Sequence, residues 1–189
     1  MAMLKLTNII HSYGDAPVLK GISLTLSPGQ RIALMGPSGV GKTTLLRIAL
    51  GLLKPGAGTV ENTFRKTAAV FQEPRLLPWR TAAENVNLVL GDDRAAMEKA
   101  RLHLQQLGLG PAADKYPREL SGGMQQRVSI ARALAAEGDL LILDEPFKAM
   151  DEDLRNQVMA RVSQTKAAIL LVTHDEEEAE ALGCEIIRI

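Results

Sequence analysis

The sequence predicts an α/β protein built around a parallel β-sheet. Three short apolar runs, residues 31–35, 140–143 and 168–172, are typical of buried strands. A glycine-rich turn and a helical pattern follow the first run, and helical patterns also follow the other two. Strands that alternate with helices in this way usually form a parallel sheet with helices packed on it.

The stretch GPSGVGKTT, residues 36–44, fits the pattern Gly, four residues, Gly, Lys and Ser or Thr. Small residues let backbone N–H groups face inward, and a helix that begins near Lys42 adds the positive end of its dipole. Such a turn fits a triphosphate, with Lys42 reaching the β- and γ-phosphates and the Thr43 hydroxyl binding Mg²⁺. A chance glycine turn is the alternative, and the flanking strand and helix disfavour it. The candidate nucleotide-binding residues of this stretch are Gly36, Ser38, Gly39, Gly41, Lys42, Thr43 and Thr44.

Composition places the chain among ordinary globular proteins. Its 189 residues are 46% apolar and 23% charged, enough for one core with a small lobe attached. Lys plus Arg and Asp plus Glu both number 22, so no net basic field favours nucleic acid. No apolar run approaches the roughly 20 residues of a membrane-spanning helix, and the N-terminal stretch lacks a signal-peptide apolar region. We expect a soluble, intracellular chain that binds no nucleic acid, with its single cysteine, Cys184, as a small apolar residue.

The N-terminal part is rich in β-structure. Strands are expected at residues 4–10 and 22–26, with a loop between them that contains Tyr13 and Val18. Tyr13 is either a packed turn residue or a ring that stacks on a nucleotide base, and residue chemistry alone does not decide between them. Residues 54–60 are expected to turn sharply, a strand is expected at 68–72, and a last strand near 185–188.

Helix caps mark a helical lobe in the middle of the chain. Thr81 with Glu84 forms a capping box that opens a helix to about residue 90. Asp92 or Asp93 caps a second helix, and Ser121 caps a third that contains two glycines in its first turn. Two later helices are expected, one capped by Asp151 and a short acidic one over 175–182 whose carboxylates form a solvated face.

The loop between residues 71 and 80 carries large apolar side chains between two prolines. Leu76, Leu77 and Trp79 are unusual in a loop. They are either tucked under the protein or form a docking surface for a partner, and both interpretations stay open.

Polar residues follow the buried strands at the ends where a parallel sheet binds ligands. Asp144 suits Mg²⁺ held through water, Glu145 suits a base that polarises an attacking water, and His174 suits a contact with the γ-phosphate. The alternative for the carboxylates is a solvated turn with an ion pair.

Five motifs together make the chain similar to the nucleotide-binding subunits of ABC transporters over essentially its whole length. In family order they are GPSGVGKTT (Walker A), Gln72 in VFQEP, LSGGMQQRV (the signature), LLILDEP (Walker B) and His174 in VTHD. The resemblance implies a P-loop ATPase core with a mixed or parallel sheet and an N-terminal antiparallel β-subdomain. A helical subdomain over about residues 74–135 completes a single domain of residues 1–189.

The resemblance also implies roles and partners. Tyr13, with Val18 beside it, would contact adenine, and Gln72 would reach Mg²⁺ or its water. A head-to-tail homodimer would place Ser121, Gly122 and Gly123 of one subunit on the ATP held by the other. A transmembrane permease and an extracytoplasmic solute-binding protein are further expected partners, with the ATPase peripheral on the cytoplasmic face of the membrane.

Within the family, FQEPRLLPWRTAAENV is similar to ATPases of importers for nitrate, sulfonates and taurine. Met124 stands where the signature usually has Gln, and Lys148 stands where Ser is frequent; no regulatory C-terminal domain is expected. The main alternative is a soluble ABC-type ATPase that acts on DNA or ribosomes. A small-molecule kinase and a non-hydrolysing module fit less well, because the signature helix, Lys42 and Glu145 are all present.

Overall fold

The structure, a computed structural model, describes residues 2–91, 93–148 and 150–189. Two compact units make up the chain. The first comprises Met1–Thr67, Asp139–Asp144 and Lys166–Ile189, and the second comprises Ala68–Gly138 and Glu145–Thr165.

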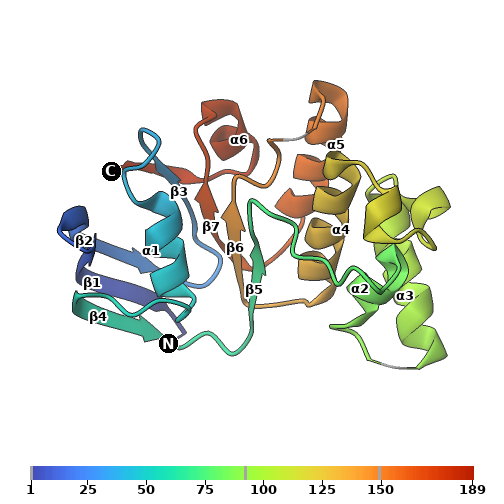
Figure 1. Cartoon of the computed structure of the whole chain (residues 1–189), viewed down its shortest axis with the longest axis horizontal. Helices are drawn as coiled ribbons and strands as arrows, with labels where there is room; N and C mark the ends of the chain where they lie inside the picture. Colours follow the sequence, from blue (N-terminus) through green and yellow to red (C-terminus); the bar gives the residue numbers. More distant parts are fainter. Residues whose placement is uncertain (1, 92, 149) are drawn as a thin grey trace. The chain divides into compact units, whose positions relative to one another are not determined.

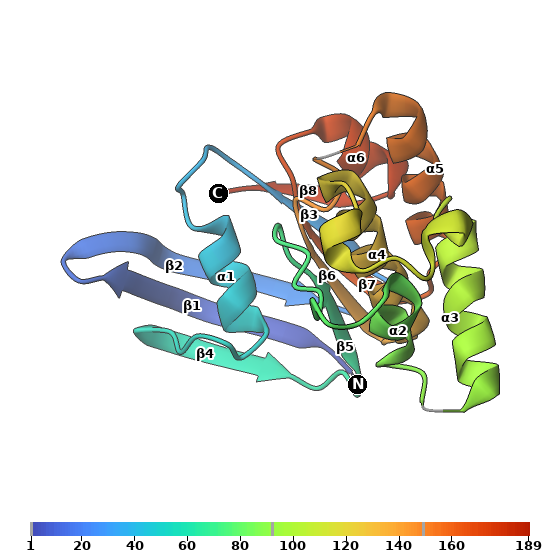
Figure 2. The same cartoon turned by 45° about the vertical axis from the view of Figure 1, so that its right-hand side comes forward.

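The first unit contains the predicted parallel sheet. Strands β6 (Leu140–Asp144), β7 (Ala168–Val172), β3 (Arg31–Met35) and β8 (Glu185–Arg188) lie side by side in this order, and each adjacent pair is parallel (Figure 1; β8 is labelled in Figure 2). Every residue of β6 and β7 is buried, as their continuous apolar sequences predicted. The carboxyl ends of β6, β7 and β3 therefore meet at one edge of the sheet.

A second, antiparallel sheet of this unit has the order β2–β1–β4. Strands β1 (Leu4–Tyr13) and β2 (Ala16–Leu26) are longer than predicted, so Tyr13 ends a strand and Val18 lies within one. Strand β4 (Ala57–Asn62) replaces the turn expected there, and pairing with β1 stabilises a segment with no buried residue. Helix α1 (Lys42–Ala49) contacts both β4 and β6.

The acidic segment after β7 is less solvated than predicted. Helix α6 (Glu176–Ala181) begins after Asp175, whose side chain accepts a hydrogen bond from the backbone N–H of Glu177. Glu178, however, is buried and accepts a hydrogen bond from the Thr173 hydroxyl. The prediction of a fully exposed acidic face was wrong for this residue, because one side of a helix that packs on a sheet is covered.

Cys184 immediately precedes β8 and is partly buried. Burial raises the pKa of its thiol to about 11, against a smaller opposing effect of Arg31. The thiol therefore stays protonated at neutral pH, and this fits the predicted role as a small apolar residue.

The second unit is mainly helical. It begins within β5 (Thr67–Val70) and contains α2 (Ala82–Asn87), α3 (Arg94–Gln106), α4 (Gly122–Ala135) and α5 (Glu152–Ser163), with short 3₁₀ turns at Gly110–Ala112 and Pro117–Glu119. Helices α2, α3 and α4 contact one another (Figure 2). Among the helices of the described ranges, none has the length and apolar character needed to cross a membrane.

The predicted helix caps of this unit are present. The Thr81 hydroxyl accepts from the backbone N–H of Glu84, whose carboxylate accepts from the backbone N–H of Thr81. Asp93, Ser121 and Asp151 cap α3, α4 and α5 with their side chains. Asp92, the alternative cap of α3, lies outside the described residues.

The loop from Phe71 to Thr81 is held at several points by side chains of the helices. Nε2 of Gln126, on α4, donates to the carbonyl oxygen of Phe71. Arg132, also on α4, donates to the carbonyl oxygens of Pro74 and Arg75. Since these side chains bond main-chain atoms, they determine the path of the loop.

Asn85, fully buried on α2, holds the far end of the same loop. Its Oδ1 accepts from the backbone N–H of Leu77 at 2.8 Å, and its Nδ2 donates to the carbonyl oxygens of Leu77, Arg80 and Thr81. The apolar loop residues differ in exposure. Leu76 and Leu77 are half-buried, as expected of residues tucked under the protein, whereas Trp79 is 68% exposed, as expected of a residue in a docking surface.

Candidate nucleotide site

The phosphate loop runs from the end of β3 to the start of α1. Gly39 and Gly41 have φ of 83° and 106°, in the left-handed region that side chains disfavour. A Cβ atom on Gly41 would also lie 2.8 Å from Cγ1 of Val18 and 2.7 Å from Cδ2 of Leu19. Glycine is therefore required at Gly41 by both conformation and space.

Gly41 is also the N-cap residue of α1. Within the described part of the chain, no side chain caps the first turn of this helix, so its backbone N–H groups face the loop. Because such groups form an anion site together with the helix dipole, this end of α1 fits a phosphate group.

Lys42 is the first residue of α1 and is 8% exposed. Its Nζ donates to the carbonyl oxygens of Gly36 and Pro37, at 2.7 and 3.0 Å. The ammonium group is thus held by the loop at the place where a bound phosphate would be, and it can exchange these carbonyl oxygens for phosphate oxygens without leaving the loop.

Thr43 and Asp144 lie together although 101 residues separate them. Oγ1 of Thr43 donates to Oδ1 of Asp144 at 3.2 Å. A hydroxyl and a carboxylate are hard oxygen ligands of the kind that Mg²⁺ prefers, so these two residues fit the ion that accompanies a nucleoside triphosphate. The next residue of α1, Thr44, is buried, and Ser38 is exposed in the loop.

The β1–β2 hairpin flanks the phosphate loop, because Val18 of β2 lies against Gly41. Tyr13, at the end of β1, is 50% exposed and packs edge-on against His11, with ring centroids 4.9 Å apart. Its other surface is open to a ligand, so stacking on a nucleotide base stays a prediction.

We expect Tyr13→Ala to weaken ATP binding by about 1 kcal/mol, or roughly fivefold in Kd, which is the scale of one aromatic contact. Tyr13→Phe keeps the ring and should bind ATP almost as tightly as the unaltered chain. Titration of both variants with fluorescent ATP tests this. Equal losses in the two variants would instead assign the contribution to the hydroxyl group.

His174 follows β7 and is exposed. Because β7 pairs in parallel with β3, His174 lies at the same sheet edge as the phosphate loop. Its role at the γ-phosphate stays a prediction.

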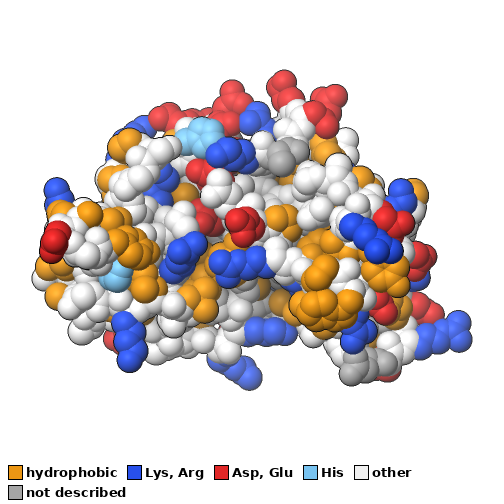
Figure 3. Space-filling view, viewed as in Figure 1, with side chains coloured by type: hydrophobic (Ala, Val, Ile, Leu, Met, Phe, Trp, Pro, Cys, Tyr) orange, Lys and Arg blue, Asp and Glu red, His pale blue; other side chains and the backbone are white. Residues whose placement is uncertain are grey.

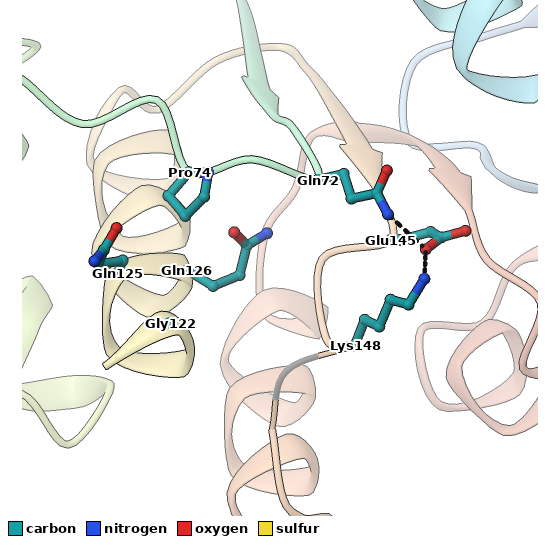
Figure 4. A pocket seen from close by; sticks show the side chains of 7 residues that line it. All are labelled: Gln72, Pro74, Gly122, Gln125, Gln126, Glu145 and Lys148. Carbon is teal, nitrogen blue, oxygen red and sulfur yellow. Dashed lines mark hydrogen bonds and ion pairs between the residues drawn. The ribbon is translucent and has the colours of Figure 1, made fainter. Parts of the chain in front are cut away.

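Glu145, the first residue after Asp144, belongs to the second unit, where it forms a group with Gln72 and Lys148 (Figure 4). Its Oε2 accepts from Nε2 of Gln72 at 3.4 Å and from Nζ of Lys148 at 2.9 Å. Hydrogen bonding to Glu145 raises the pKa of Lys148. These residues border a cavity of about 280 Å³ that is also lined by Pro74, Gly122, Gln125 and Gln126.

The sequence did not predict that Lys148 contacts Glu145. The one sequence feature that could have indicated this contact is that Lys148 comes three residues after Glu145, in the turn that follows the strand. Spacing of this kind brings side chains together only when the turn has the right shape, and that shape was not predictable.

Ser121 and the first residues of α4 form a second helix N-terminus in the second unit. Oγ of Ser121 accepts from the backbone N–H of Met124 at 3.3 Å. A Cβ atom on Gly122 would have no neighbour within 4 Å among the described residues, so this end of α4 is open. It can receive an anion from outside the unit.

A helix end built to hold phosphate, with a lysine inside it and a hydroxyl–carboxylate pair beside it, defines a class: the P-loop proteins that bind nucleoside triphosphates. Comparisons with known proteins narrow this class. The sequence profile described as ABC transporter matches residues 19–148. The chain belongs to the ABC transporter family, and it is an ATP-binding subunit that hydrolyses ATP.

Several known proteins are similar to this chain in sequence or structure. An aliphatic sulfonates import ATP-binding protein of Rhodococcus jostii is 45% identical, over 97% of this chain and 78% of the relative. A protein of the same description from Nocardia farcinica is 48% identical, over 91% of this chain and 70% of the relative. Among solved structures, the dimeric ATP-binding cassette MJ0796 with ADP and Pi superimposes with a TM-score of 0.90 at 32% identity, covering 98% of this chain and 94% of that one.

Proposed function

We propose that the chain powers the import of small solutes, with aliphatic sulfonates as the first candidates. The observation that carries this proposal is the similarity to aliphatic sulfonate import proteins of several bacteria, at 41–48% identity over at least 91% of this chain. The nature of the solute is supported by the relatives alone, because an ATPase subunit does not contact the solute.

In the proposed mechanism the first unit binds the nucleotide. Backbone N–H groups of Gly39 and Gly41 and the dipole of α1 hold the phosphates, while Lys42 moves from its two carbonyl partners to the β- and γ-phosphate oxygens. Thr43 and Asp144 would hold Mg²⁺, and the role proposed for Gln72 is that of a further ligand or a partner of its water. When bound, this ion offsets charge that develops on the phosphates.

Glu145 is the proposed general base. Its carboxylate accepts a proton from the water that attacks the γ-phosphate, and His174 donates a hydrogen bond to a γ-phosphate oxygen. Attack breaks the bond between the γ-phosphorus and the bridging oxygen, and ADP leaves with that oxygen while the water oxygen stays on the released phosphate.

We further propose that two copies of the chain act together. The open N-terminus of α4, with Ser121, Gly122 and Gly123, closes on the ATP held by the partner subunit. The dimeric state of MJ0796 supports this arrangement. One chain would then have two helix ends suited to phosphate because each serves a different nucleotide.

The proposed partners are a transmembrane permease and an extracytoplasmic solute-binding protein, with this chain peripheral on the inner face of the cell membrane. Trp79 is the candidate contact with the permease, since it is the most exposed large apolar side chain of the described residues. Hydrophobic side chains gather in the same region, over α2 and the loop before it (Figure 3).

Transport by a reconstituted complex tests the proposal. The chain, its permease and its binding protein would be placed in lipid vesicles, and uptake of radiolabelled ethanesulfonate and nitrate would be measured with and without ATP. ATP-dependent uptake of ethanesulfonate is expected. ATP hydrolysis without uptake of either solute would contradict the import function. Uptake of nitrate alone would show that nitrate, and not an aliphatic sulfonate, is the transported solute.

Trp79→Ala should weaken assembly with the permease while ATP hydrolysis by the purified chain stays near normal. The indole ring is exposed, so its loss removes apolar contact area from an interface and little from the protein's own core. Co-purification with the tagged permease measures the effect, and recovery should fall several-fold.

Leu102→Ala is the matched control, because Leu102 is a 53% exposed apolar residue on α3. It should leave recovery unchanged. Equal recovery of the Trp79 variant and the unaltered chain would show that Trp79 does not contact the permease.

A further inference from the structure

Lys148 forms an ion pair with Glu145, the side chain that the proposed function uses as base. Nζ of Lys148 lies 2.9 Å from Oε2 of Glu145, and Nε2 of Gln72 lies 3.4 Å from the same oxygen. Figure 4 shows both nitrogen atoms directed at that one oxygen, from separate segments of the chain. Two donors therefore meet on a single carboxylate oxygen.

The main chain keeps Lys148 in this place. Glu145 has φ of 45°, a left-handed conformation that turns the chain sharply where β6 ends. Phe147 is buried, and its carbonyl oxygen accepts from the backbone N–H of Met150 at 3.2 Å. The turn that carries Lys148 back toward Glu145 is thus anchored by a buried ring and a hydrogen bond.

The hydrogen-bonding capacity of the carboxylate determines what this arrangement does. Each carboxylate oxygen offers two lone pairs. A general base must accept the proton of a water at about 2.6–3.2 Å. Gln72 and Lys148 both bond Oε2, so while these contacts hold only Oε1 can accept from an attacking water, and the two contacts fix the direction in which Oε1 points.

We propose that Lys148 is a brake on ATP hydrolysis, which holds Glu145 against Gln72 in a resting arrangement until the ion pair opens. The proposal rests on the proposed role of Glu145 as base. Lys148 is a positioning residue, since it acts through Glu145.

The exposure of the ion pair sets the size of the effect. The side chain of Lys148 is 56% exposed and that of Glu145 is 20% exposed. Ion pairs with this much solvent contact are weak, so removal of the cation should raise kcat only about two- to five-fold. KM for ATP should stay the same, because nucleotide binding depends on the phosphate loop.

Steady-state ATP hydrolysis by the full chain tests the brake. Lys148→Met keeps most of the side-chain length and removes the charge, and Lys148→Arg keeps a cation within reach of Glu145. The expected result is a higher kcat for the Met variant with unchanged KM, and retention of the slow rate by the Arg variant. Lys99→Met, at an exposed lysine of α3, is the control and should leave both constants unchanged.

Glu145→Gln, measured in parallel, separates the two proposals. If this variant hydrolyses ATP normally, the base assignment fails and the brake fails with it. If it is inactive while Lys148→Met has an unchanged or lowered kcat, the brake alone is overturned. A rise in kcat for Lys148→Met and Lys148→Arg alike would also overturn the brake, because charge would not then be its cause.

Discussion

Glu145→Gln should lower the rate of ATP hydrolysis by about 10² to 10⁴ while ATP still binds. An amide keeps the shape and the hydrogen-bonding oxygen of the carboxylate but cannot take a proton from water, and loss of a general base typically costs this much. Binding should survive because Lys42, Thr43 and the backbone of the phosphate loop are unchanged.

Phosphate release and equilibrium binding of labelled ATP measure the two effects separately. Glu152→Gln, at an exposed carboxylate in the first turn of α5, is the matched control and should hydrolyse ATP at the normal rate. A normal rate for Glu145→Gln would falsify the base assignment. A loss of ATP binding would show instead that Glu145 supports the nucleotide site.

Gly122→Asp in the Glu145→Gln background should abolish an ATP-dependent dimer. Slow hydrolysis should trap the closed pair, so Glu145→Gln alone should elute as a monomer without nucleotide and as a dimer with ATP. An aspartate in the first turn of α4 suits the positive end of its own helix dipole, and its Cβ would meet no atom of the described residues within 4 Å. It would, however, repel the phosphates of a nucleotide held by the partner subunit.

Size-exclusion chromatography with and without ATP gives the result, and the thermal unfolding midpoint checks that the fold is intact. Gly122→Asn adds similar bulk without charge and should weaken the dimer less than aspartate does. A Gly122→Asp protein that dimerises with ATP as before would place the phosphate contact elsewhere. If Glu145→Gln binds ATP but stays monomeric, the isolated chain does not form the proposed ATP-bound dimer.

The elements predicted best from sequence are those whose local signal and tertiary setting agree. Strands β3, β6 and β7 are continuous apolar runs buried on both faces, so composition alone indicated their place in the sheet. The phosphate loop was predictable because its glycines are needed for main-chain conformation, which leaves a strict spacing in the sequence. Helix caps at Thr81, Asp93, Ser121 and Asp151 followed from local hydrogen bonding, and the first of these is a complete capping box.

Features that depend on strand pairing, helix packing or an unusual main-chain conformation were missed. Strand β4 has no buried residue and is a strand because it pairs with β1, about 50 residues earlier. The burial of Glu178 depends on Thr173 and the packing of α6. The contact between Lys148 and Glu145 depends on a left-handed residue that is not glycine, for which the sequence carries no clear sign.

Asn85 fixes the main-chain path at the far end of the loop from Phe71 to Thr81 independently of the side chains that the loop exposes. The buried Asn85 amide accepts one hydrogen bond from the main chain of Leu77 and donates three to the main chain of Leu77, Arg80 and Thr81. These four bonds determine the path of the backbone, whatever side chains the loop presents to solvent. Exposed positions such as Trp79 can therefore change during evolution without altering the conformation of the loop. Surface substitutions alone could then match related ATPases to different membrane proteins. The same property makes the segment a suitable place for engineering partner choice, provided that Asn85 is kept.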